Sequence, residues 1–165
     1  MDTKLKNHSQ FKQGYLYAVR LLTASKKSER EIVKRLGEKG YAPEAIEEIT
    51  AQLKAQRILS DQKLTQETIQ TALLEKRYGP KRIYYNLRKR GISSAEAQKA
   101  ADAYPKSAER EAANELAQAR WLRLERVEPK KRKKRLYDFL INRGFNPELS
   151  REIVMHIETK KNEDF

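Results

Sequence analysis

Apolar positions recur along this chain in a pattern that is repeated three times around a glycine. In each copy an apolar residue, a leucine and a glycine follow one another at intervals of four, and two more residues of the set stand nine and thirteen positions beyond the glycine. The positions are Ile32, Leu36, Gly40, Ile49 and Leu53; Ile83, Leu87, Gly91, Ala100 and Tyr104; and Leu136, Leu140, Gly144, Ile153 and Ile157. Because spacings of four place side chains on one face of a helix, each copy predicts a helix, a stop at glycine and a second helix.

Residues that start and stop helices stand at matching places in the three copies. Glycine ends a helix readily because it takes the left-handed conformation at little cost. The inner helix, before the glycine, has its own start signals: Ser28 and Glu31 have capping-box spacing, and Pro80 and Pro129 suit a first turn. The helix after the glycine opens at a polar or proline pair, which is Ala42 with Pro43, Ser93 with Ser94, and Asn146 with Pro147.

A further helical stretch precedes each copy, at about residues 10–24, 61–78 and 107–124. We therefore predict an all-α protein of three tandem three-helix repeats, with about nine helices forming an elongated body. The predicted repeats are residues 1–60, 61–104 and 105–165. Hydrophobic residues are 38% of the chain and charged residues 36%, so each repeat is expected to bury only a thin core.

Charge is the second strong feature of the sequence. The chain has 36 lysines and arginines against 23 acidic residues, a formal net charge of +13, which favours an anionic partner. It has no cysteine, which suits a reducing compartment, and the first residues lack an apolar signal core. No stretch approaches the roughly 20 apolar residues of a membrane span. We therefore expect a cytoplasmic protein that does not bind membranes.

Enzymatic chemistry is not expected. The sequence has two histidines, His8 and His156, and neither has a partner at the spacing of a metal site or a catalytic triad. The acidic residues alternate with cations along helices or lie in first turns, where pairing and the helix dipole account for them. We predict no catalytic residue, no metal and no cofactor.

The first candidate contact region is residues 76–90, which hold seven cations and no acid. On the predicted helix from Pro80, Ile83 and Leu87 mark the apolar face and leave a basic stripe with one tyrosine on another face. Such a stripe suits phosphates with base stacking on the tyrosine, although a solvated face is the alternative. The candidates are Lys76, Arg77, Lys81, Arg82, Tyr85, Arg88, Lys89 and Arg90.

The turn at Gly79 and Pro80 lacks the glycine pattern of a nucleotide-binding loop. It is expected to start a helix, and its free N–H groups beside Lys81 and Arg82 suit a single backbone phosphate.

The second candidate region is a run of six cations that opens the inner helix of the third copy. It comprises Lys130, Lys131, Arg132, Lys133, Lys134 and Arg135. Cations crowded at a helix N-terminus oppose the dipole and each other, so we infer an anion-binding function and not a structural need. The nearby Trp121 suits either core packing or a stacking contact with a partner.

The chain resembles the RecX family, bacterial regulatory proteins of the RecA recombinase, over about residues 15–157. The resemblance rests on the order and spacing of several segments, which are 18–22, 28–32, 36–41, 58–61, 78–83 with Leu87, 90–92, 136–140 and 143–145. One departure is Ser60 before Asp61, where the family often has two aspartates; either residue caps the following helix.

The resemblance implies a curved body of three-helix modules that lies in the groove of the RecA filament on single-stranded DNA. Such a protein would cap, block or destabilise the filament and lower its ATP hydrolysis, strand exchange and co-protease activity. The processes that it would affect are DNA repair, recombination and the SOS response. Its expected partners are the RecA filament, single-stranded DNA and, more weakly, duplex DNA, and a monomer is expected. The alternative is a general basic DNA-binding or architectural protein; an enzyme acting on DNA ranks third.

Overall fold

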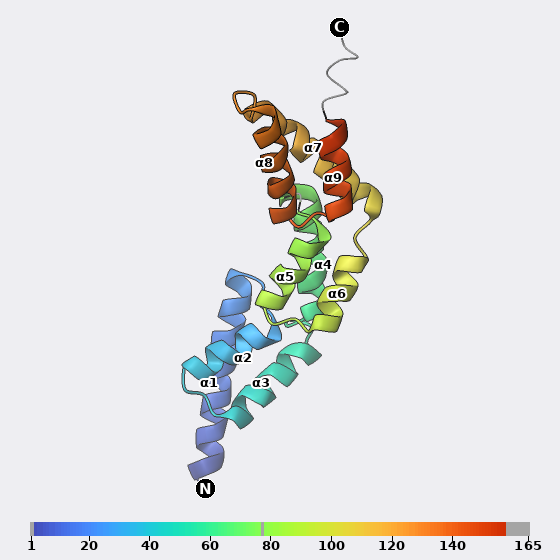
Figure 1. Ribbon diagram of the computed structural model, residues 1–165. Helices are drawn as coiled ribbons and strands as arrows, with labels where there is room; N and C mark the ends of the chain where they lie inside the picture. Colours follow the sequence, from blue (N-terminus) through green and yellow to red (C-terminus); the bar gives the residue numbers. More distant parts are fainter. Residues whose placement is uncertain (1, 77, 158–165) are drawn as a thin grey trace. The chain divides into compact units, whose positions relative to one another are not determined.

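The computed structural model of the chain describes residues 2–76 and 78–157. This described part contains nine α-helices, one π-helical segment and no strand (Figure 1). The elements are α1 (Asp2–Ala24), α2 (Glu29–Glu38), α3 (Pro43–Ala55), α4 (Asp61–Thr71), η1 (Ala72–Lys76), α5 (Pro80–Lys89), α6 (Ser94–Asp102), α7 (Lys106–Arg123), α8 (Pro129–Asn142) and α9 (Pro147–His156). The predicted all-α fold is confirmed.

One predicted helix differs in kind. The expected single helix over residues 61–78 is α4 followed by the π-helical segment η1. The N–H of Tyr78 then donates to the carbonyl of Ala72 at 3.1 Å. A π-helical turn is defined by hydrogen bonds between residues five apart, and a segment of five residues is too short for apolar spacing to reveal it.

Two compact units make up the chain: residues 1–66 with 87–93, and residues 67–86 with 94–165. The division passes through α4 and through α5. The predicted repeat boundaries after residues 60 and 104 stay a prediction.

In the first unit, α1, α2 and α3 enclose a small core (blue to teal in Figure 1). Its buried residues are Ala18, Ile32, Leu36, Ile46, Ile49, Leu53 and Leu59. Fully burying one leucine or isoleucine side chain contributes about 1.5–3 kcal/mol, so this short list holds the three helices together.

In the second unit, α7, α8 and α9 enclose a core of their own (orange and red in Figure 1). Its largest members are Trp121, Leu136, Leu140, Phe145 and Ile153. Trp121 is only 6% exposed, so of its two predicted roles, core packing is correct and stacking on a partner is not.

The three repeat glycines end their helices in the same way. Gly40, Gly91 and Gly144 have φ of 83°, 90° and 87°. After each glycine the next N–H donates back to the leucine carbonyl five positions earlier, at 3.3, 3.1 and 3.2 Å. This is the Schellman arrangement, in which a left-handed glycine closes the helix. The glycine stops predicted from the sequence are confirmed.

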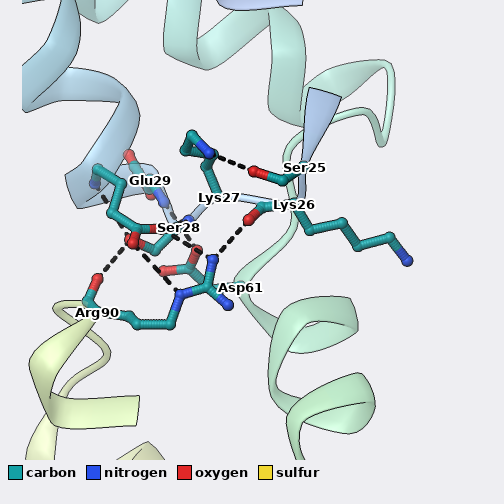
Figure 2. A network of polar contacts seen from close by, with 8 residues as sticks. Ser25, Lys26, Lys27, Ser28, Glu29, Asp61 and Arg90 are labelled. Atoms are coloured by element: carbon teal, nitrogen blue, oxygen red, sulfur yellow. Dashed lines mark hydrogen bonds and ion pairs between the residues drawn. The ribbon is translucent and has the colours of Figure 1, made fainter. Parts of the chain in front are cut away.

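The turn at Gly91 docks on the start of α2 within the first unit. Ser28 caps α2 in a capping box with Glu31. Its hydroxyl also donates to the carbonyl of Arg90 (Figure 2). The N–H of Glu29 donates to a carboxylate oxygen of Asp61 at 2.9 Å. Besides its own capping box, the start of α2 therefore bonds to residues 32 and 62 positions away in the sequence.

The turn at Gly144 docks on the start of α5 in the same manner, within the second unit. The N–H of Gly79 donates to the carbonyl of Arg143 at 3.0 Å, and the N–H of Lys81 donates to the carbonyl of Gly144 at 3.1 Å. Both donors that were expected to hold a phosphate are thus already bonded. The predicted phosphate site at this helix start is wrong, because the next glycine turn occupies it.

The two docked turns define a joint that recurs along the chain. In each joint the glycine of one copy meets the start of the inner helix of the copy before it, at Ser28 in one case and at Gly79 in the other. Gly40 has no such neighbour, since a Cβ added there would meet no heavy atom of the described chain within 4 Å.

The inner helix of the third copy begins earlier than its counterparts. Alignment on the three glycines places Arg132 where Ser28 and Gly79 stand, yet α8 already begins at Pro129. The helix has 14 residues against 10 in α2 and in α5. The additional turn carries the first cations of the basic run.

The joint predicts an order of cost for alanine at the three glycines. Gly40→Ala should lower the free energy of unfolding by about 1 kcal/mol, because only the left-handed backbone opposes it. Gly91→Ala should cost more, because the Cβ would press on the flexible Arg30 side chain. Gly144→Ala should cost most, roughly 2–4 kcal/mol, because the Cβ would lie within 3 Å of the Arg82 backbone N and Cα. Urea unfolding followed by circular dichroism measures the order, and equal costs at all three would contradict it.

Candidate nucleic-acid and filament interface

The predicted contact residues lie on α5, beside it at Lys76 in η1 and at Arg90 after its end, and at the start of α8. The side chain of Lys76 and the whole of Arg77 lie outside the part of the chain that the structure describes. The division into units also separates the α5 candidates, with Lys81, Arg82 and Tyr85 in the second unit and Arg88, Lys89 and Arg90 in the first.

The exposed and buried faces of α5 are those that the sequence predicted. Ile83 and Leu87 are fully buried, whereas Lys81, Arg82 and Tyr85 are exposed. Tyr85 is 57% exposed, and its ring meets that of Tyr84 edge to face at 5.5 Å. Tyr85 therefore offers an aromatic surface to solvent beside cations, which is what stacking on a base requires.

Arg88, near the end of α5, and Arg90, just after it, have partners within the first unit. Nη1 of Arg88 donates to the carbonyl of Ile92 at 2.7 Å and so ties down the glycine turn. Nη2 of Arg90 donates to a Glu31 carboxylate oxygen at 3.1 Å and also to the carbonyl of Lys26 (Figure 2). Arg90 therefore fixes the joint at α2, a role that its place in a basic stretch did not indicate.

Burial and bonding act in opposite directions on Glu31. Partial burial acts to raise the pKa of this carboxyl, but hydrogen bonds from Arg90 and Ser28 and the positive charge of Arg90 outweigh it. The net result is a pKa of Glu31 below its ordinary value. The ion pair with Arg90 therefore persists into mildly acidic solution.

Docking of the Gly91 turn creates a cationic hollow in the first unit, with a volume of about 560 Å³. We call it the first-unit hollow. Its lining is Lys27, Arg30, Glu31, Lys34, Arg35, Glu38, Arg88, Lys89, Arg90 and Gly91. Seven of these residues are cations and two are acids, so its field attracts anions.

Both carboxylates of the first-unit hollow are already paired. Glu31 bonds to Arg90, and Glu38 lies 3.8 Å from Nζ of Lys34 and 3.4 Å from Nη1 of Arg35. Lys27, Arg30, Lys34 and Arg35 were not among the contact residues predicted from the sequence. They join the hollow only because the docked turn brings α2 and the end of α5 together.

The basic run on α8 is less free than its sequence suggested. The guanidinium of Arg132 lies 3.6 Å from the centre of the Trp121 ring, and its Nη2 donates to the Trp121 carbonyl at 2.6 Å. Arg132 thus covers the core tryptophan, so the inference that this run has no structural role is wrong for this residue.

Two lysines of the run also have acidic partners. Lys131 lies 3.5 Å from Glu128, and Lys134 lies 3.0 Å from Asp138. These pairs are exposed and contribute little to stability. Lys130, Lys131, Lys134 and Arg135 are exposed, and their role in contacting a partner stays a prediction.

The part of the chain that the structure describes contains no group of three or more histidine, cysteine, aspartate or glutamate side chains placed to hold a metal ion. Nδ1 of His156 lies 2.8 Å from the carbonyl of Glu152, one turn earlier on α9. Among the same residues, every helix is too short or too polar to cross a membrane.

Comparison with known proteins identifies the fold. The model of the first three-helix domain of RecX matches residues 15–53, and the model of its third three-helix domain matches residues 108–154. The chain belongs to the RecX family. RecX structures agree, since the crystal structure of RecX from Lactobacillus salivarius covers 92% of this chain and 99% of its own at a TM-score of 0.82 and 21% identity. A second crystal structure of regulatory protein RecX has a TM-score of 0.81 and 23% identity; the match covers 93% of this chain and 77% of the other.

Two relatives are each named regulatory protein RecX. That of Pelodictyon phaeoclathratiforme is 29% identical over 129 residues, covering 78% of this chain and 79% of its own length. That of Oceanobacillus iheyensis is 21% identical over 152 residues, which is 92% of this chain but 56% of the relative. This RecX-family chain therefore spans little more than half the length of the Oceanobacillus protein.

The Glu31 pair predicts a pH dependence of stability. Because the pKa of Glu31 is lowered on folding, its stabilising effect is fully present above the ordinary carboxyl range of about 4 and is lost as pH falls through the lower folded value. Glu31→Gln should cost about 1–2 kcal/mol near pH 7, and this difference from the unmodified protein should shrink below about pH 4. Urea unfolding between pH 3 and 7 measures it.

The matched control is Glu38→Gln, an exposed carboxylate on the same helix, which should change the free energy of unfolding by less than about 0.5 kcal/mol. A Glu31→Gln cost that stays constant down to pH 3 would contradict the role assigned to the pair.

Proposed function

We propose that this RecX-family chain is a noncatalytic regulator of a RecA recombinase. It binds in the groove of the RecA filament on single-stranded DNA and lowers ATP hydrolysis, strand exchange and co-protease activity. The two relatives named regulatory protein RecX support the regulatory role. A cationic chain with several separate cationic surfaces suits a filament whose axis carries a polyanion.

The first-unit hollow is the observation that carries this proposal. Seven cations line it, and its only two carboxylates are each bonded to one or more of those cations. Cations held so close together repel one another, and an anion placed among them relieves that repulsion. Phosphates of the filament's DNA, or acidic side chains of its protein, satisfy the hollow.

A second candidate function is a general basic DNA-binding protein that competes for DNA by charge alone. The net charge of +13 and the exposed cations of α8 favour it. On duplex DNA its affinity would fall with salt by about 0.9 log units per tenfold change in salt for each phosphate neutralised. The two candidates differ in what they recognise, a filament or bare DNA.

The decisive experiment is a titration of this chain into a bacterial RecA recombinase that hydrolyses ATP on single-stranded DNA. We expect inhibition at amounts well below those needed to coat the DNA, because a regulator acts on assembled filament. Inhibition only at DNA-saturating amounts, relieved by added DNA or salt, would establish the general DNA-binding function instead.

A charge-matched pair of variants tests the first-unit hollow. Replacing Lys34, Arg35 and Lys89 by glutamine removes three cations that line it. Replacing Lys12, Lys99 and Arg123 by glutamine removes the same charge from exposed positions that do not line this hollow. We expect the first variant to need at least about tenfold more protein for half-inhibition, because two or three phosphate contacts are lost. Equal effects of the two variants would mean that net charge acts, and not this hollow.

A further inference from the structure

Five side chains of the second unit form an alternating ladder of guanidinium groups and aromatic rings. In order they are Arg82, Tyr78, Arg143, Phe139 and Arg120. The guanidinium carbons of Arg82 and Arg143 lie 5.7 and 5.5 Å from the centre of the Tyr78 ring. Those of Arg143 and Arg120 lie 5.3 and 5.4 Å from the centre of the Phe139 ring.

A hollow of about 420 Å³ lies against one end of the ladder. Its lining is Arg120, Arg135, Asp138, Phe139, Asn142 and Arg143. Asp138 is the one acid of this lining, and it is paired with Lys134 at 3.0 Å. The volume falls in the ordinary range for small-molecule sites, and the lining combines flat stacking groups, cations and an amide.

Arg120 has hydrogen-bonding capacity that the fold does not use. Its Nε is buried and finds no acceptor among the described residues. A buried donor without an acceptor costs free energy. Arg120 also lines the hollow, so a ligand there would lie beside this guanidinium.

We propose that this hollow takes up an unpaired base of single-stranded DNA. Aromatic rings and guanidinium planes are the protein groups on which bases stack, and stacking on an exposed base needs no base pair to be broken. The ladder supplies both kinds of group. Among the other lining residues, Asn142 offers a donor and an acceptor to a base edge, and Arg135 offers a cation to a flanking phosphate. The inference rests on the proposed function only in taking DNA as the ligand.

Synthetic oligonucleotides separate base binding from phosphate binding. We would compare a single-stranded oligothymidylate with a strand of equal length whose residues all lack bases, using fluorescence anisotropy and the full chain. Both strands carry the same phosphates. The unmodified protein should bind the base-bearing strand at least about fivefold more tightly, since stacking of one base is worth that much.

Arg120→Lys combined with Arg143→Lys keeps the charge and removes two stacking planes. This variant should bind the base-free strand as before and lose most of its preference for bases. The matched control is Arg123→Lys combined with Arg151→Lys, at exposed positions that do not line the hollow, and it should keep the preference. Phe139→Leu is the second test, because it keeps an apolar side chain against the core while removing the ring.

Two results would overturn the proposal. One is an unmodified protein that binds both strands equally, and the other is a folded Arg120→Lys, Arg143→Lys variant or Phe139→Leu variant with its base preference intact. The recombinase titration distinguishes this failure from that of the proposed function. Inhibition without base preference would contradict only the base-binding site at the ladder. Base preference without inhibition would contradict the proposed regulatory function and support the base-binding site.

Discussion

The left-handed glycine at the end of each inner helix is the constraint on which the rest of the structure depends. Its missing Cβ lets the turn at Gly91 reach the capped start of α2, and the turn at Gly144 reach Gly79 at the start of α5. Each docked turn does two things. It satisfies polar groups of the helix start that receives it, and it brings the cations beside the glycine onto the surface of the preceding copy.

Local features of the fold were readable because they depend on neighbours in the sequence. The capping box at Ser28, the glycine stops and the buried face of α5 follow from spacing and from intrinsic conformational preference. The partner of each glycine turn was not readable. The bond from Ser28 to Arg90 joins residues 62 positions apart, and no periodicity encodes which surface a turn meets. The phosphate site expected at Gly79 failed for this reason.

The charged surface was predictable as a total but not in its distribution. The sequence places many cations on α5 and α8, yet Arg90 and Arg132 serve the fold, through Glu31 and through Trp121. The two hollows combine residues from separate helices, so their shared lining appears only once the helices pack. Arg120 and Arg143 were missed because neither belongs to an unbroken run of cations, which is the pattern that is visible directly in the sequence.

The joint at the Gly144 turn is held by hydrogen bonds between backbone atoms. At the Gly144 turn, both hydrogen bonds to the start of α5 run from main-chain N–H to main-chain carbonyl. Such bonds place no demand on side chains beyond glycine itself, so evolution can replace most of the surface without disturbing the stacking of the copies. Sequences in this family can therefore drift far apart while the architecture persists, which accords with 21% identity at a TM-score of 0.82 to the Lactobacillus protein.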